Sequence, residues 1–161
     1  MARRSFLKKR VSTSPNLYRT IVTKFLLNKI LKKGKKFLAI KIITDTLAFL
    51  KAKTFKSPLF ILEKAFQNIA PKIKMETIKV KEGSSYQIAI LLNKYGSLNT
   101  AIRWILASSE KRSEKHFFLR LASEILDSYQ KIGNSFKKKI ELYKNAVANQ
   151  KNNMLNGIYD Q

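Results

Sequence analysis

The sequence predicts a mainly α-helical single domain of about six helices, with a protruding β-hairpin (ribbon) and a flexible basic N-terminal arm. Apolar residues recur at helical spacing along most of the chain, and this spacing changes to a period of two near residues 72–92. The 161 residues suit one domain, and 45% of them are hydrophobic, which is enough to form a core. The predicted boundaries are an arm at residues 1–13, a helical domain at residues 14–151 and a tail at residues 152–161.

Three helices are expected before the hairpin. The first begins at Ser14-Pro15, because serine suits the N-cap and proline the first helical position, and it ends near Gly34. The second follows Lys35-Lys36, and the third begins at Ser57-Pro58 and stops at Pro71. Their inward stripes are expected to contain Leu17, Ile21, Phe25 and Ile30, then Ile40, Ile43, Leu47 and Leu50, and finally Leu62, Ala65, Phe66 and Ile69.

The alternating segment predicts a hairpin between residues 72 and 92. Its apolar positions fall out of step between Met75 and Ile78, which predicts a β-bulge at that point. Residues 82–84, Glu-Gly-Ser, supply the chemistry of a turn between the two strands. The second strand is expected to contain Tyr86, Ile88, Ile90 and Leu92.

Three further helices are expected after the hairpin. Residues 94–97 are interpreted as a turn, so the fourth helix starts close to Ala101 and ends within residues 108–113. The fifth helix runs to Gly133, and the last one frays near Asn152. Their inward stripes are expected to contain Ala101, Ile102, Ile105 and Leu106, then Leu119, Ala122, Ile125, Leu126 and Tyr129, and finally Phe136, Ile140, Tyr143 and Val147.

The charge of the chain is strongly positive. Lys and Arg number 33 against 10 Asp and Glu, which gives a formal net charge of +23. Repulsion at this level works against a compact state, so a polyanion is expected to compensate it, and nucleic acid is the first candidate. The absence of cysteine and the single histidine exclude disulfides, cysteine nucleophiles and multi-ligand zinc sites, and we expect no cofactor. No apolar run approaches the roughly 20 residues of a membrane span.

The residues that could support catalysis have simpler interpretations. Glu124 and Asp127 lie three apart and are interpreted as surface carboxylates, with Asp127 pairing with Lys131 at i,i+4. His116 is expected to be exposed after a helix break, and Trp104 is expected to belong to the core. We therefore expect that the protein is not an enzyme.

The cations fall in five clusters, which favours binding to the phosphates of a nucleic acid. No zinc finger, basic zipper or aromatic RNA-recognition motif appears, so an irregular RNA surface read by shape and phosphates fits best. The clusters contain Arg3, Arg4, Lys8, Lys9 and Arg10; Lys32, Lys33, Lys35 and Lys36; Lys72, Lys74, Lys79 and Lys81; Lys111 and Arg112; and Lys137, Lys138 and Lys139.

Two other functions are alternatives to RNA binding. A basic helical protein that docks on an acidic membrane or an acidic protein partner would carry its cations on one amphipathic helix. Here they are spread over the arm, the hairpin and several helices, which argues against this alternative. A nuclease would need a constellation of carboxylates or histidines that the sequence does not offer.

Three blocks in this chain resemble a known family. They are Gly34-Lys35-Lys36, then residues 83–87 (Gly-Ser-Ser-Tyr-Gln) on the hairpin, and then residues 101–105 (Ala-Ile-Arg-Trp-Ile). In this order and at these separations they resemble the small-subunit ribosomal protein seven family of bacterial and organellar type, over about residues 1 to 150. Residues 57–59 and 119–125 add to the likeness.

The resemblance implies a helical body and ribbon bound to the 3′ major (head) domain of small-subunit ribosomal RNA. It also implies a role in head assembly and at the exit-site side of the mRNA and tRNA path, with ribosomal protein eleven as a neighbour. The last helix and the hairpin would face the exit site. The residues implied to contact RNA are Arg3, Arg4, Lys8, Lys9, Arg10, Lys35, Lys36, Lys72, Lys74, Lys79, Lys81, Arg103, Lys111 and Arg112.

The chain departs from the family pattern in three places. Glu82-Gly83 stands where paired glycines are usual, residues 93–97 carry a single cation where arginines are usual, and residues 157–161 lack the usual basic aromatic ending. Lysine also far outnumbers arginine, as in proteins from AT-rich genomes. Together these features favour a mitochondrial ribosome, then a plastid ribosome, over the bacterial cytoplasm.

Overall fold

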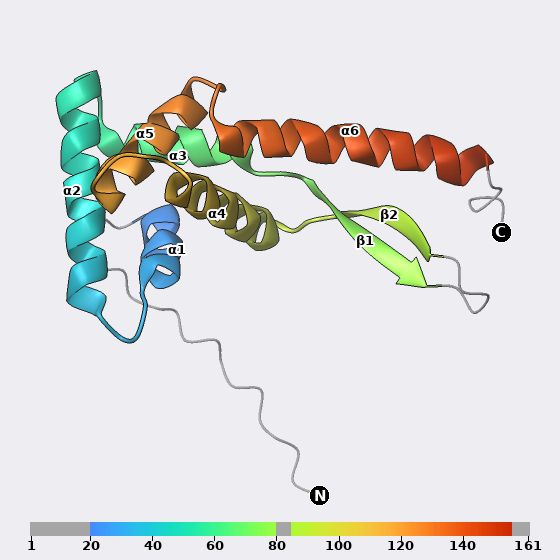
Figure 1. The fold of residues 1–161 in the computed structure, drawn as a ribbon, viewed down its shortest axis with the longest axis horizontal. Helices are drawn as coiled ribbons and strands as arrows, with labels where there is room; N and C mark the ends of the chain where they lie inside the picture. Colours follow the sequence, from blue (N-terminus) through green and yellow to red (C-terminus); the bar gives the residue numbers. More distant parts are fainter. Residues whose placement is uncertain (1–19, 80–84, 156–161) are drawn as a thin grey trace, which may run out of the picture.

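The computed structural model describes residues 20–79 and 85–155, which contain six α-helices and a two-stranded antiparallel sheet (Figure 1). This confirms the expected helical fold with one hairpin. The helices are α1 (Ile21–Ile30), α2 (Lys36–Thr54), α3 (Pro58–Ile69), α4 (Lys94–Glu110), α5 (Phe117–Tyr129) and α6 (Asn134–Leu155), and the strands are β1 (Ile73–Lys79) and β2 (Ser85–Leu91). None of the described helices is long and apolar enough to cross a bilayer.

The hydrophobic core lies where α1 to α5 meet. Helix α5 is central, because it contacts α2, α3 and α4, and its Leu121, Ala122 and Ile125 are fully buried. Phe66 of α3 is the largest fully buried apolar side chain among the described residues. The inward stripe expected for α3 is confirmed, because Leu62, Ala65, Phe66 and Ile69 are all buried.

The first helix begins later than the sequence predicts. Thr20 has an extended backbone, and its hydroxyl accepts a hydrogen bond from the Thr23 N–H at 3.3 Å, so Thr20 is the N-cap and α1 starts at Ile21. The predicted start at Ser14-Pro15 is therefore wrong for this helix, and those two residues lie outside the described ones.

The fourth helix begins earlier than predicted. The side chain of Asn93 accepts a hydrogen bond from the Gly96 N–H at 2.7 Å, which caps a helix that starts at Lys94. Residues 94–97, interpreted as a turn from their composition, form the first turn of α4 instead. The cap supplies the partner that the first amides of a helix lack, and this outweighs the low helix propensity of glycine.

The hairpin pairs without interruption from Ile73 opposite Leu91 to Lys79 opposite Ser85. The predicted bulge between Met75 and Ile78 is therefore wrong. The two residues simply lie on opposite faces of a ribbon that carries apolar side chains on both. One face lies against α6, where Asn149 Nδ2 donates to Gln87 Oε1 at 2.9 Å.

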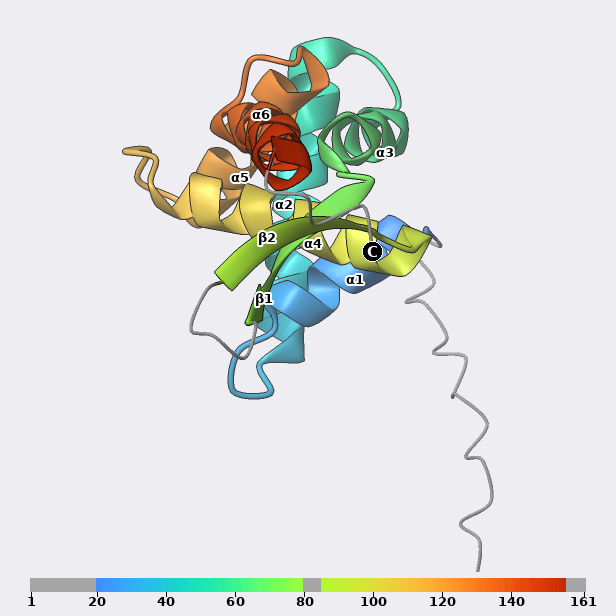
Figure 2. The same ribbon diagram turned by 90° about the vertical axis from the view of Figure 1, so that its right-hand side faces the viewer.

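Helix α6 extends beyond the helical body alongside the hairpin, and Figure 2 shows the ribbon below it. It continues to Leu155, past the predicted fraying at Asn152. The predicted inward stripe is partly wrong, since Ile140 is 41% and Val147 55% exposed. The reason is that the outer part of α6 has the narrow hairpin beside it in place of a helical layer.

Candidate nucleic-acid interface

The predicted RNA-binding cations occupy several separate positions. Some lie outside the described residues, and the side chain of Lys79 on β1 is not described. Those outside are Arg3, Arg4, Lys8, Lys9, Arg10 and Lys81. The others belong to the turn between α1 and α2, the base of the hairpin, α4 with the residues after it, and the start of α6.

The turn between α1 and α2 presents four exposed lysines, which we call the basic turn: Lys32, Lys33, Lys35 and Lys36. Lys33 and Gly34 have φ angles of 52° and 73°, and the Lys35 N–H donates to the Lys32 carbonyl at 3.1 Å. Positive φ at both central residues defines a tight turn in which glycine is favoured. Gly34 therefore forms this turn, and the prediction that it ends the first helix is wrong, since α1 ends at Ile30.

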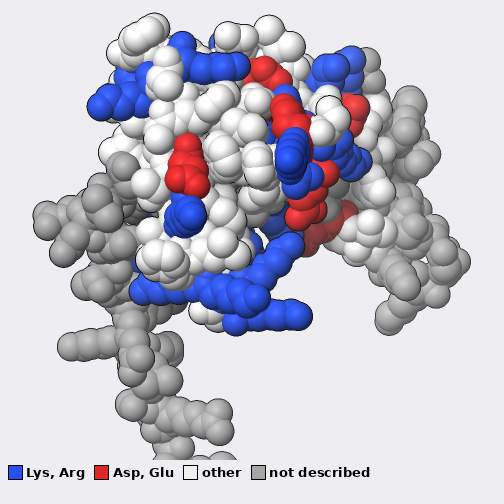
Figure 3. Space-filling model, turned by 60° about the vertical axis from the view of Figure 1, so that its left-hand side comes forward, with Lys and Arg blue, Asp and Glu red and all other residues white. Residues whose placement is uncertain are grey.

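The fold brings two further cations to the basic turn. Lys29, at the end of α1, and Arg120, in α5, line the same hollow as three of its lysines. Figure 3 shows Lys and Arg side chains gathered along the lower edge of the described surface, at the height of this turn in Figure 1. Neither residue was predicted as a candidate. Lys29 falls within the first predicted helix, and nothing in the sequence brings Arg120 of α5 next to this turn.

A second group of cations, the hairpin-base cluster, contains Lys72, Lys131 and Lys139. Burial lowers the pKa of Lys139, and the nearby charges of Lys72 and Lys131 lower it further. Its Nζ donates to the Asn68 carbonyl at 2.6 Å, which holds the ammonium group in place. Three cations that repel one another would gain from a phosphate between them. In the same stretch of α6, Lys137 is exposed and Lys138 is half-buried.

The other predicted cations are more dispersed. Lys74 pairs with Glu76 on the same face of β1, so its charge is partly neutralised. Arg103 is exposed on α4, with a 3.5 Å hydrogen bond to the Thr100 hydroxyl, and Lys111 is exposed directly after α4.

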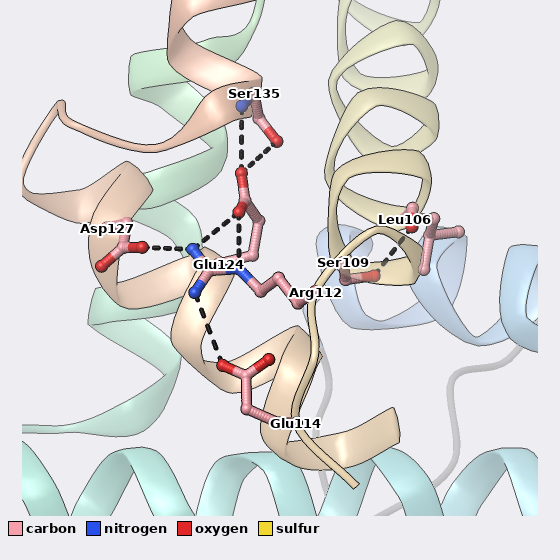
Figure 4. Close-up of polar contacts among 7 residues, drawn as sticks. All are labelled: Leu106, Ser109, Arg112, Glu114, Glu124, Asp127 and Ser135. Atoms are coloured by element: carbon pink, nitrogen blue, oxygen red, sulfur yellow. Dashed lines mark hydrogen bonds and ion pairs between the residues drawn. The ribbon is translucent and has the colours of Figure 1, made fainter. Parts of the chain in front are cut away.

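Arg112 has an internal role instead (Figure 4). Its Nε donates to Glu124 at 2.9 Å, and its guanidinium also pairs with Asp127 and, at 3.6 Å, with Glu114. Glu124 is 0% exposed and also accepts hydrogen bonds from the N–H and hydroxyl of Ser135, at 3.0 and 2.7 Å. This ion-pair cluster joins the end of α4 to α5 and α6, so we remove Arg112 from the candidate interface.

The structure also shows where the candidate catalytic residues lie and which partners they have. The prediction that Glu124 lies on the surface is wrong, as is the pairing of Asp127 with Lys131, because Arg112 holds both carboxylates. His116 is exposed, as predicted, and Trp104 packs partly buried against the core. Across residues 20–79 and 85–155, no group of His, Asp and Glu side chains is arranged to hold a metal ion.

Comparison with known proteins places these features in a family context. The family model described as Ribosomal protein S7p/S5e matches residues 1–150. The chain is 39% identical over 150 residues to the small ribosomal subunit protein uS7c of Tetradesmus obliquus, covering 92% of this chain and 89% of that protein. It is 37% identical over 150 residues to uS7c of Pleurastrum terricola, covering 93% and 97%, and 34% identical over 144 residues to uS7c of Trieres chinensis, covering 89% and 90%.

Proposed function

Because the chain belongs to the ribosomal protein S7p/S5e family, we propose that it is a structural, non-catalytic component of the small ribosomal subunit. The observation that carries this conclusion is the match over residues 1–150, together with small-subunit relatives that span most of the chain. Its partners are small-subunit ribosomal RNA and neighbouring ribosomal proteins. The family consists of structural ribosome components, so no reaction is assigned to the chain.

The mechanism that we propose is electrostatic. Lysines of the basic turn and the hairpin-base cluster replace the counterions of RNA phosphates, and the helical body fixes the distance between these two groups. We propose that the RNA is the 3′ major (head) domain and that the arm and the hairpin contact it as well. Helix α6 and the hairpin project from the same side of the body, which supports placing both toward the exit site, with ribosomal protein eleven as a neighbour.

The compartment that we propose is the plastid. An organellar ribosome agrees with the three relatives, whose names all carry the chloroplast suffix c. These names do not support the mitochondrion, which the lysine bias and the altered hairpin turn favoured. Because the genomes of both organelles can be rich in A and T, a bias toward lysine does not distinguish between them.

We expect steeply salt-dependent binding to a transcript of the head domain of small-subunit RNA. Because each neutralised phosphate releases counterions, the slope of log affinity against log salt concentration should be about −3 or steeper, which corresponds to four or more phosphates. Filter binding over a salt series measures this slope. A shallower slope would contradict an interface that combines the basic turn with the hairpin-base cluster.

Reversing two charges of the basic turn should weaken RNA binding about tenfold at moderate salt, and the K35E/K36E double variant tests this expectation. The matched control is K51E/K56E, which makes the same change in net charge at two exposed positions, one in the last turn of α2 and one just after this helix. If the two double variants lose affinity equally, the effect comes from net charge alone, and the basic turn is not part of the interface.

A further inference from the structure

A hollow with a volume of about 460 Å³ lies beside the basic turn, where α1 and α4 end and α2 and α5 begin. This volume is within the range of roughly 300–1,000 Å³ that small-molecule sites occupy. Its apolar lining includes Leu38 and Ile42 of α2, Leu106 of α4 and Phe117 of α5. Five cations line the same hollow: Lys29, Lys32, Lys33, Lys35 and Arg120.

The charge around this hollow is almost entirely positive. Glu110 is the one carboxylate among its lining residues, and it pairs with Lys32 at 3.8 Å in an exposed position. Exposed ion pairs of this kind are weak, so a ligand with more negative charge can replace Glu110 as the partner of Lys32. A ligand that fits must therefore combine negative charge for the cations with an apolar part for the apolar lining.

Arg120 has hydrogen-bond donors that the described part of the chain leaves unused. Its guanidinium carbon lies 5.6 Å from the centre of the Phe117 ring, and its Nη1 makes a long 3.4 Å hydrogen bond to the Glu110 carbonyl. Its Nε is buried and has no hydrogen-bond partner within the described part of the chain. The planar guanidinium of arginine both stacks on nucleobases and pairs with phosphates.

We infer that this hollow receives one unstacked nucleotide of the ribosomal RNA. The base enters between Leu38 and Phe117, and the flanking phosphates meet the lysines that line the hollow. A nucleotide fits because it joins a flat, largely apolar body directly to phosphates. A base inside a paired helix is hidden in its stack, so the nucleotide must come from a bulge or a single strand. This inference rests on the proposed function and adds to it a preference for a particular RNA feature.

The test compares three RNA hairpins of the same sequence. One is fully paired, one carries a single bulged 2-aminopurine nucleotide, and one carries an abasic bulge at the same place. Stacking of one base against a protein contributes enough to change affinity about tenfold. We expect the full-length protein to bind the 2-aminopurine bulge about tenfold more tightly than the other two RNAs, with a change in 2-aminopurine emission on binding.

Two matched variants test whether the preference for the bulged base depends on this hollow. Leu38 is 52% exposed and lines the hollow, whereas its neighbour Phe37 is 83% exposed and is not among the lining residues. L38E and F37E therefore make the same change in charge at adjacent exposed positions. We expect L38E to lose the preference for the bulged base and F37E to keep it.

The outcomes separate this inference from the proposed function. Equal affinity of the unmodified protein for all three RNAs, with a steep salt dependence, overturns the nucleotide site and leaves the proposed function in place. Equal affinity for the 2-aminopurine and abasic bulges overturns it as well, because the base then contributes nothing. A preference that survives in L38E, or is lost equally in F37E, also overturns it. A failure to bind any of the three hairpins overturns the nucleotide site, and binding to the head-domain transcript then tests the proposed function separately.

Discussion

Replacing Arg112 by methionine is expected to lower the free energy of unfolding by about 3–5 kcal/mol, because it leaves a buried carboxylate without its counter-charge. Glu124 is completely buried, and Arg112 donates to it at 2.9 Å. The hydrogen bonds from Ser135 remain in the variant, but they do not neutralise the charge. Single domains are stable by about 5–15 kcal/mol, so the expected loss is a large part of the total.

Urea unfolding measures the free energy of unfolding of R112M, and two control variants show whether any loss comes from the ion-pair cluster. K111M removes the same charge at the adjacent exposed position and should change stability by less than about 0.5 kcal/mol. The double variant R112M/E124Q removes the orphaned carboxylate and should recover part of the loss. Loss of a cation from a chain of net charge +23 relieves repulsion in either single variant, so a destabilisation confined to R112M reports the ion-pair cluster. Equal stability of R112M and K111M would contradict it.

The sequence predicts well those parts of the fold whose signals are local. Ser57-Pro58 and Pro71 bracket α3, and the structure places this helix at Pro58–Ile69, because proline acts through its own ring and missing N–H. The alternation in residues 72–92 similarly locates the hairpin. Where a local signal was ambiguous, the prediction failed, as at residues 94–97, where a single side-chain cap from Asn93 turns an apparent loop into helix.

The candidate site was less predictable, because the sequence shows charge but not burial. Arg112 and Lys111 are adjacent cations with the same appearance in the sequence. Only the fold shows that Glu124 and Asp127, twelve and fifteen residues further on, enclose Arg112 while Lys111 stays exposed. Conversely, Arg120 is far from the basic turn in the sequence, and only the fold brings the two together.

The hairpin is a separable part of the molecule. All residues of the core cluster belong to helices, and the contacts of both strands with the rest of the described structure are mainly with α6. The base of the hairpin is narrow, because the Leu92 N–H donates to the Lys72 carbonyl at 2.8 Å. A short glycine linker between these two residues can therefore replace residues 73–91 without moving any helix of the core.

We expect this deletion to leave the body folded while affinity for the head-domain transcript falls about 10–100-fold. The deleted segment contains Lys74, Lys79 and Lys81, and the loss of three phosphate contacts should make the salt slope shallower by about 2–3 units. Thermal unfolding followed by circular dichroism should give a melting temperature within a few degrees of the intact protein, because the core is untouched.

A ribbon can bind RNA through phosphate contacts or by fitting the shape of the RNA. The variant K74Q/K79Q/K81Q, which removes only the charges, distinguishes these two contributions. It keeps the antiparallel ladder and removes the cations, so it should reproduce the change in salt slope. Phosphate contacts contribute least at high salt. If the ribbon also fits the shape of the RNA, the deletion variant should bind more weakly than K74Q/K79Q/K81Q under these conditions. Undiminished affinity in the deletion would exclude the hairpin from the interface. Unfolding of the deletion would show instead that the helical core depends on the ribbon, contrary to the packing described above.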